Sequence, residues 1–316
     1  MPNSFLSEAD VRARLDPALL VTAIEAAFRD RYSSVTIPDR TQAIIPQGTF
    51  ITMACCDRIG NALGIKLALV RNQPREAAPG EGCVHATYLL LDPETTEPRL
   101  TIAANYLTDL RTAATSAVAT KFLARPDATT LGIFGTGRQA RAHLRVMLLI
   151  RPFRQVLVCG QTEARSDEFV REVLPEMPGI TVTATDARTC AAESDVLCTC
   201  TTSPDPLFDG GVLRAGTHLN LVGAFQPHTR EVDTHTIKNA RVVVDTYVGA
   251  RTEMGELLIP LREGAIAGDH VASDLHELVS GKKEGRRNRE EVTVFKSVGC
   301  ALEDLVAAEV LMATQS

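Results

Sequence analysis

Apolar positions follow a helical spacing at the start of the chain. In residues 7–31 apolar side chains recur every three or four positions, as at Val11 and Leu15, and this spacing predicts helix. The pair Asp16-Pro17 predicts a break, after which a second helix begins at Pro17, because proline fits the first turn of a helix.

The spacing changes beyond residue 37. Short runs rich in β-branched and apolar residues are separated by turn residues such as Pro46-Gln47-Gly48, a pattern typical of strands joined by tight turns. We expect an antiparallel sheet with strands at Ala43–Ile45, Phe50–Ala54, Ala62–Val70 and Val84–Leu91. An alanine-rich helix is predicted over Leu107–Leu123, ending before Pro126.

Strands and helices alternate from Thr130 onward. Helices are expected from the turn after the first strand to Ile150, over Glu163–Leu174 and, last, over Ala301–Met312. The predicted strands are Thr130–Phe134, Gln155–Cys159, Ile180–Thr185, Val196–Thr199, His218–Val222, Arg241–Asp245 and Thr293–Ser297. Strands separated by helices predict a parallel sheet with right-handed crossovers, so the fold class is α/β, with a Rossmann domain beside an α+β domain.

Bulk composition narrows the class of protein. A chain of 316 residues is long enough for two domains with cores of their own. The net charge of -6 argues against a nucleic-acid partner, and no apolar run is long enough to span a membrane. The eight cysteines lack zinc-site spacing, so no metal is expected, and reduced thiols fit a cytoplasmic protein. A signal peptide is not expected, because four charged residues interrupt the N-terminal region: Glu8, Asp10, Arg12 and Arg14.

The segment after the strand Thr130–Phe134 has the spacing of a dinucleotide-binding turn. Gly135 permits a tight turn, Gly137 lets backbone approach a pyrophosphate, and Ala140 replaces the third glycine of the usual motif. The helix that follows offers free N–H groups and a positive dipole end. We predict that NAD(P) binds through this turn, which comprises Gly135, Thr136, Gly137, Arg138, Gln139 and Ala140.

The end of the second strand bears on the choice of dinucleotide. NAD enzymes usually carry Asp or Glu there for the ribose hydroxyls, whereas Gln161 and Thr162 follow this strand. Arg165 and Arg138 lie close in sequence, and a guanidinium can pair with a 2′-phosphate in bidentate fashion. An ordinary surface charge is the alternative for Arg165. The sequence favours NADP(H), with NAD(H) possible.

Several motifs in a fixed order resemble the ornithine cyclodeaminase and mu-crystallin family over nearly the whole chain. The most specific is Leu110-Arg111-Thr112-Ala113-Ala114-Thr115-Ser116. The others are Gly64-Ile65-Lys66, the turn Gly135 to Ala140, Gly223-Ala224 with Pro227 and Glu231, Glu256 to Pro260, and Val294 to Gly299. The resemblance implies a homodimer, with residues 1–120 plus 298–316 as substrate and dimerisation domain and 121–297 as the Rossmann domain.

Three cations are candidates for the substrate site. A substrate carboxylate needs a cationic clamp, for which arginine is best suited. Arg111 is expected to open an alanine-rich helix, where the dipole disfavours a cation, so a bound anion would account for it. The resemblance implies that Arg40 and Arg111 hold the carboxylate and that Lys66 faces the reacting group as acid or base. Without the resemblance, an edge charge facing water would be the preferred interpretation of Lys66.

Other site residues rest on position or on the resemblance. Thr201 and Thr202 follow the carboxyl end of a strand, where cofactors bind in open parallel sheets. The resemblance adds Val298 to the substrate contacts. It adds Arg111, Thr112, Val222, Gly223 and Ser297 to the cofactor contacts.

Phe225 departs from the family pattern. In the cyclodeaminase this position carries an aspartate that works as acid and base, and phenylalanine cannot transfer protons. The resemblance then implies an NAD(P)H-dependent reductase of a small cyclic α-imino acid, such as Δ1-pyrroline-2-carboxylate or a related ketimine. Four alternatives stay open: an acyclic imino-acid reductase, an amino-acid dehydrogenase, a cyclodeaminase-type lyase, and a non-catalytic protein that binds NADPH and a small ligand.

Overall fold

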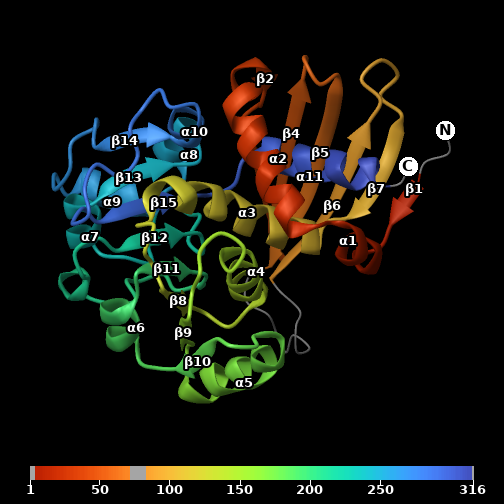
Figure 1. Ribbon diagram of the computed structural model, residues 1–316. Coiled ribbons are helices and arrows are strands. Elements are labelled where there is room, and N and C mark those ends of the chain that lie inside the picture. Colours follow the sequence, from red (N-terminus) through yellow and green to blue (C-terminus); the bar gives the residue numbers. More distant parts are fainter. Residues whose placement is uncertain (1–3, 72–82, 315–316) are drawn as a thin grey trace. The chain divides into compact units, whose positions relative to one another are not determined.

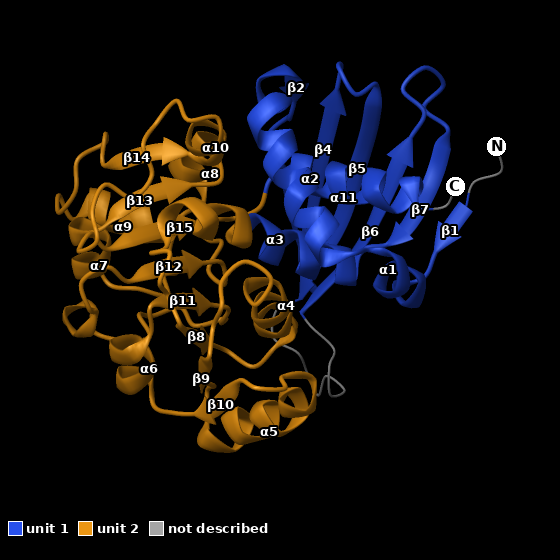
Figure 2. Cartoon of the chain, in the orientation of Figure 1, with its two compact units in different colours: residues 1–115, 300–316 blue, residues 116–299 orange. Residues whose placement is uncertain are grey.

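The computed structural model describes residues 4–71 and 83–314. The chain forms two compact units, Met1–Thr115 with Cys300–Ser316, and Ser116–Gly299 (Figure 2). Helix α3 (Asn105–Leu123) contributes residues to both. The chain therefore leaves the first unit in mid-helix and returns to it for the last helix.

The first unit is built on a seven-stranded sheet (Figure 1). Its order is β1-β7-β6-β5-β4-β2, with β3 also paired to β4. Neighbouring strands are antiparallel except β1 and β7, which are parallel. The bounds are β1 Ser4–Leu6, β2 Val35–Thr36, β3 Thr41–Ile45, β4 Gly48–Asp57, β5 Ala62–Arg71, β6 Val84–Leu91 and β7 Pro98–Ala103. The predicted antiparallel strands are confirmed, while β1, β2 and β7 were not predicted.

Helices cover one face of this sheet. Ser7 caps α1 (Glu8–Arg14) in a reciprocal capping box with Asp10, and α2 (Pro17–Asp30) begins at Pro17 as predicted; a short 3-10 turn, Tyr32–Ser34, follows. Alternate residues of β4 are buried on the covered face. The C-terminal helix α11 (Ala301–Ala313) packs on α2 and on strands β4, β5 and β6. A segment from the far end of the sequence thus completes the core of the N-terminal unit.

The second unit contains an eight-stranded, all-parallel sheet. Its order is β10-β9-β8-β11-β12-β15-β13-β14. The bounds are β8 Thr130–Phe134, β9 Gln155–Cys159, β10 Thr181–Ala184, β11 Val196–Thr199, β12 His218–Leu221, β13 Arg241–Val244, β14 Val271–Asp274 and β15 Thr293–Lys296. The predicted α/β class and parallel sheet are confirmed, and β14 is an additional strand.

The helices of this unit connect successive strands. They are α4 Arg138–Met147, α5 Glu163–Val173, α6 Ala187–Glu193, α7 Thr234–Asn239, α8 Tyr247–Thr252, α9 Gly255–Arg262 and α10 Leu275–Val279, with 3-10 turns at Leu174–Glu176 and Gly210–Val212. Helices α6 to α10 are short and were not predicted. Most begin at a capping side chain, such as Asp186 for α6 and Asp233 for α7, so their ends are fixed locally by single residues.

The strand order places a switch point beside β8. Strands β9 and β10 lie on one side of β8, while β11 and the later strands lie on the other. The segments that follow β8 and β11 therefore leave the same edge of the sheet in opposite directions, the position at which open parallel sheets bind ligands.

Among residues 4–71 and 83–314, none of the helices combines the length and the apolar character that a membrane crossing requires.

Candidate active site

The turn after β8 has the geometry of a phosphate-binding loop. Gly135 has φ +104°, and a Cβ there would lie 2.5 Å from the carbonyl oxygen of Cys200 in the neighbouring β11 segment. Gly137 is the N-cap of α4, and a Cβ at this position would meet nothing within 4 Å. The N-cap of α4 makes no side-chain hydrogen bond to the first turn of the helix. This arrangement fits a dinucleotide pyrophosphate.

The turn after β9 lies against the phosphate-binding loop. The amide of Gly135 donates to the Cys159 carbonyl at 2.8 Å. A Cβ at Gly160 would lie 2.9 Å from the methyl group of Thr136. Beyond this contact, Gln161, Thr162 and Arg165 are exposed, and Thr162 caps α5 by accepting from the Arg165 amide. The structure thus brings the turn after β9 into contact with the glycine turn at Gly135 and Thr136.

Glu231 joins the ends of β11 and β12. It is fully buried, and its carboxylate accepts from the hydroxyls of Thr199 and Thr201 at 2.7 and 2.8 Å. It also accepts from the amides of Thr201 and Gly223 at 2.8 and 2.7 Å. One carboxylate therefore fixes Thr201, half-exposed in the structure, and Gly223. Thr202 and Val222 adjoin these residues in the chain, the first exposed and the second half-exposed.

A buried lysine holds the next part of the loop. Lys296 Nζ donates to the Ala224 carbonyl at 2.5 Å and lies 3.1 Å from the Glu256 carboxylate, both side chains being fully buried. Burial raises the pKa of Glu256, which Lys296 opposes. Phe225 follows Ala224 directly and is half-exposed. The phenylalanine is therefore carried by a turn that is fixed immediately before it.

Asp245 organises the chain after β15. Its buried carboxylate accepts from the Ser297 hydroxyl at 2.9 Å and from the amides of Val298 and Gly299, each at 2.7 Å. It also accepts from the amide of Thr246 at 2.6 Å. Ser297 and Val298, which the resemblance assigns to the cofactor and the substrate, are thus both fixed by Asp245.

In the first unit, Lys66 is buried beside a carboxylate. It lies on β5 opposite Met53 of β4 and Tyr88 of β6, with a side chain only 3% exposed. Its Nζ donates to Asp304 of α11 at 2.8 Å. Desolvation and the nearby Arg111 lower the pKa of Lys66 to about 8, while Asp304 opposes this change. The alternative of an edge charge facing water is excluded.

Arg111 belongs to the same cluster. Its Nη1 lies 2.5 Å from Glu303 and its Nε lies 3.0 Å from Asp304. Desolvation lowers the pKa of Arg111, but the two carboxylates outweigh it and raise the pKa further above the usual arginine value. Two sequence-based expectations about Arg111 need correction. Arg111 does not open its helix, because α3 begins at Asn105. The anions that face Arg111 include two carboxylates of the protein itself, those of Glu303 and Asp304. The structure records no hydrogen bond from Nη2 to any residue it describes.

The remaining candidates of this unit are placed as follows. Thr112 is half-buried, and its hydroxyl donates to the Thr108 carbonyl at 2.8 Å. Arg40 is half-exposed between β2 and β3 and has a partner of its own.

Glu303 and Asp304 were not predicted from the sequence. The available signal was a pair of acids inside an otherwise apolar helix, which requires buried cations.

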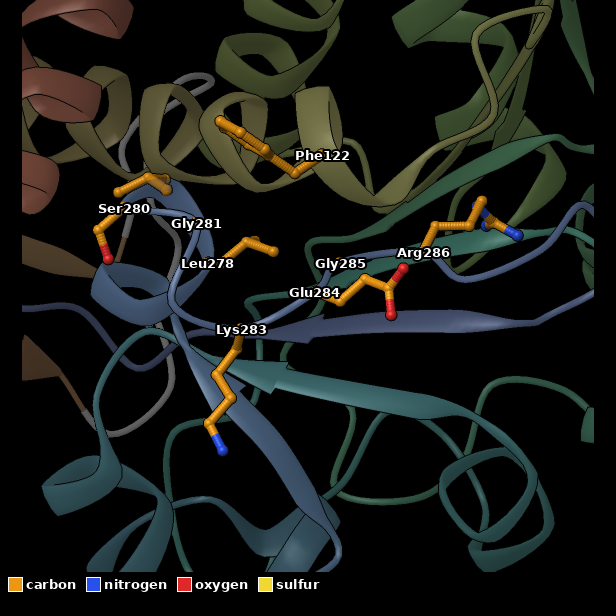
Figure 3. A pocket seen from close by; sticks show the side chains of 9 residues that line it. Phe122, Leu278, Ser280, Gly281, Lys283, Glu284, Gly285 and Arg286 are labelled. Atoms are coloured by element: carbon orange, nitrogen blue, oxygen red, sulfur yellow. The ribbon is translucent and has the colours of Figure 1, made fainter.

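A surface hollow of about 540 Å³ lies elsewhere in the second unit (Figure 3). Phe122 and Leu278 line its apolar part, and Lys283 and Arg286 also border it. The guanidinium of Arg286 is engaged by backbone carbonyls, among them those of Leu123 at 2.7 Å and Gly216 at 3.0 Å. This hollow contains none of the predicted site residues, and we do not assign the cofactor to it.

One unit has a parallel sheet with a glycine turn at its switch point, and the other has a buried lysine–arginine–carboxylate cluster, which together define a two-unit fold of the dinucleotide-binding type. The chain belongs to the ornithine cyclodeaminase/mu-crystallin family, whose sequence profile matches residues 1–315.

Similar proteins cover most of the chain. A Δ1-pyrroline-2-carboxylate reductase of Bacillus cereus is 35% identical over 266 residues, which are 84% of this chain and 81% of that protein. The structure of the Thermococcus litoralis Δ1-pyrroline-2-carboxylate reductase in complex with NADH and L-proline aligns with a TM-score of 0.94 and 33% identity, over 98% and 97% of the two chains. An archaeal alanine dehydrogenase dimer with bound NAD aligns with a TM-score of 0.91 and 28% identity, over 99% and 96%.

We predict that Glu231→Gln destabilises the second unit. The new amide group would face backbone and hydroxyl donors that now bond to a carboxylate. Leaving buried donors unsatisfied costs about 1–3 kcal/mol of unfolding free energy, which urea denaturation would measure. Glu176→Gln is the control, because Glu176 pairs with Arg145 on the surface and should change little. Equal denaturation midpoints for the two variants would contradict the role of Glu231.

Proposed function

We propose that this chain is an NAD(P)H-dependent reductase of a small cyclic α-imino acid, Δ1-pyrroline-2-carboxylate or a related ketimine, and forms the L-amino acid. The observation that carries the proposal is that two buried cations, Lys66 and Arg111, both contact the carboxylate of Asp304. The similarity to two Δ1-pyrroline-2-carboxylate reductases over most of the chain supports the same activity.

Lys66 is suited to act on the substrate nitrogen. With a pKa of about 8, it carries a proton at neutral pH and can release it at little cost. A solvated lysine titrates near 10.4 and is a weaker acid. Proton donation to an imine nitrogen keeps the carbon electrophilic, which is what reduction of a C=N bond requires.

Arg111 is suited to bind the substrate carboxylate. Glu303 and Asp304 hold its Nη1 and Nε, which orients the plane of the guanidinium. Its Nη2 bonds to no described residue and is the donor left for a ligand. Arg40 and Val298 are proposed as further substrate contacts on the resemblance.

Phe225 favours reduction over deamination. The family resemblance implies that cyclodeaminases use an aspartate at this position. The benzyl side chain of Phe225 has no proton to transfer. Its turn is fixed through Lys296 and Glu231, so the ring can act as an apolar wall for a cyclic substrate. This residue separates the proposed activity from a cyclodeaminase-type lyase.

The second unit is proposed to hold the dinucleotide. The turn from Gly135 to Ala140 would bind the pyrophosphate, and Gln161, Thr162 and Arg165 the adenosine ribose. The proposed nicotinamide contacts are Thr201, Thr202, Val222, Gly223 and Ser297, with Arg111 and Thr112 from α3. The bound dinucleotide supplies a hydride to the substrate carbon.

We also propose a homodimer, formed through the face of the first sheet opposite α11. This face presents Ile65, Leu67 and Leu69 of β5, which are only half-buried. Phe50 of the neighbouring β4, which pairs with Leu69, is 36% exposed. Apolar faces of this kind usually mark interfaces, and a similar alanine dehydrogenase is a dimer.

The direct test is a fluorescence assay of NADPH and NADH oxidation with Δ1-pyrroline-2-carboxylate and its six-membered homologue. We expect turnover with a cyclic imine, and no ammonia from L-ornithine with or without NAD, because Phe225 cannot supply the proton transfer. Ornithine turnover of about 1 per second or more would contradict the proposal. Oxidation only with acyclic imino acids would favour the acyclic alternative, and ligand binding without oxidation would favour a carrier.

Arg111→Lys should lower kcat/KM by about tenfold to a thousandfold, or roughly 1.4–4 kcal/mol, because lysine cannot hold two carboxylates and a ligand in one plane. Dinucleotide affinity should change little. Arg31→Lys is the matched control, since Arg31 also joins two carboxylates in the same unit, those of Asp57 and Glu309. Unchanged kcat/KM in Arg111→Lys, or an equal loss in Arg31→Lys, would refute the clamp.

The absence of an acid after β9 predicts tighter binding of NADPH than of NADH. Arg165→Ala should weaken NADPH binding and leave NADH binding nearly unchanged, because only NADPH carries the 2′-phosphate. Arg171→Ala, exposed on the same helix, should affect neither. Fluorescence titration of both reduced dinucleotides provides the measurement, and NADH binding as tight as NADPH binding would overturn the expected preference.

A further inference from the structure

Asp304 is shared between the two cations of the first unit. Both of its carboxylate oxygens lie 2.8 Å from Lys66 Nζ, and Oδ1 lies 3.0 Å from Arg111 Nε. The Asp304 side chain is fully buried. A carboxylate in this position fixes the separation of the two cations and the direction of both.

The first turn of α11 supplies this carboxylate. Glu303 accepts from the Cys300 amide at 3.1 Å in a capping box and pairs with Arg111 at 2.5 Å. The positive end of the helix dipole favours both acids. Glu303 therefore contacts Arg111 and the backbone, whereas Asp304 also contacts Lys66.

Two titratable side chains on the strands beside Lys66, Cys55 and Tyr88, have pKa values raised by burial. Burial raises the pKa of Cys55 on β4 to about 12 and that of Tyr88 on β6 well above its usual value. The Tyr88 hydroxyl is buried and bonds to no described residue. The charged groups that face the cluster from the packed elements are Arg111 on α3, Glu303, Asp304 and Glu309 on α11, and Arg31 with Asp57 beyond them.

We propose that Asp304 is a positioning residue that keeps Lys66 protonated and aims it at the substrate nitrogen, an inference that rests on the proposed function. In the step it supports, one N–H bond of the Lys66 ammonium breaks and a new N–H bond forms on the imine nitrogen. The carbon accepts a hydride from the reduced dinucleotide, and the C=N π electrons become the nitrogen lone pair. Lys66 is left neutral and regains a proton from solvent.

Removing the Asp304 charge should make Lys66 lose its proton at lower pH. In wild type, we expect kcat/KM for the cyclic imine to fall as pH rises through about 8. In Asp304→Asn, this alkaline limb should move to lower pH by about 1–3 units, the usual effect of an opposite charge at this distance. An activity loss without movement of the limb would show a merely structural role and overturn the proposal.

Glu303→Gln is the charge-matched control. It also removes one carboxylate from the cluster, but that carboxylate pairs with Arg111 and raises the pKa of Lys66 less than Asp304 does. It should raise KM and move the alkaline limb to lower pH by less than Asp304→Asn does. An equal shift in both variants would mean that net charge rather than the Asp304–Lys66 contact sets the titration, which contradicts the proposal.

Two further measurements keep the test decisive. If Asp304→Asn does not fold, Asp304→Glu, which keeps the charge and moves it, should show a smaller shift in the same direction. In the resting protein labelled with [13C]lysine, the ε-carbon signal lost in Lys66→Gln should titrate near pH 8 and shift in the Asp304 variants. This signal needs no turnover, so it separates a failure of the proposed function from a failure of the Asp304 role.

Discussion

The first unit depends on the burial of two cations against two carboxylates. Lys66 and Arg111 come from β5 and α3, and Glu303 and Asp304 come from the start of α11. An unpaired charge in this interior would cost several kcal/mol, and removing one partner of a buried pair typically costs about 3–5 kcal/mol. The C-terminal helix is therefore required on this sheet by charge as well as by its apolar side chains.

Such a cluster is poorly explained by stability alone. Apolar residues of similar volume often stabilise a core as well as, or better than, buried ion pairs. The lowered pKa of Lys66 has a clearer use, because a proton donor is most effective when its pKa lies near the working pH. The balance between desolvation, Arg111 and Asp304 gives Lys66 this property.

The second unit uses the same device at the edge of its parallel sheet. Glu231 gathers donors from the ends of β11 and β12, and Asp245 gathers donors from the chain after β15. Backbone amides and hydroxyls satisfy these carboxylates, so the loops that leave the sheet edge are fixed without metal or disulfide among the described residues. Preorganised loops of this kind are what a dinucleotide site needs.

Local sequence patterns predicted the helices and strands in which apolar residues recur at a regular spacing. The helix starting at Pro17, the strands of both sheets from β3 to β6 and from β8 to β13, and the glycine turn at Gly135 follow from spacing and turn chemistry. Short helices such as α6 and α8 were missed because their one or two turns are defined by a single cap, Asp186 or Thr246. Lys66 and Arg111 were found by resemblance, and their pairing with α11 is a contact across about 200 residues that no local pattern contains.

The departure at Phe225 and the cluster around Lys66 are linked by the chemistry of the proposed reaction. Deamination with ring closure needs proton transfers at more than one stage, whereas reduction of a preformed imine needs one proton and one hydride. A chain without an acid at the position after Ala224 retains Lys66 in the first unit, a buried proton donor with a pKa lowered to about 8. Burying it beside Asp304 protects the donated proton from exchange with water during hydride transfer. The loss of one acid and the tuning of one lysine thus fit the same reaction, in which a single proton donor is sufficient.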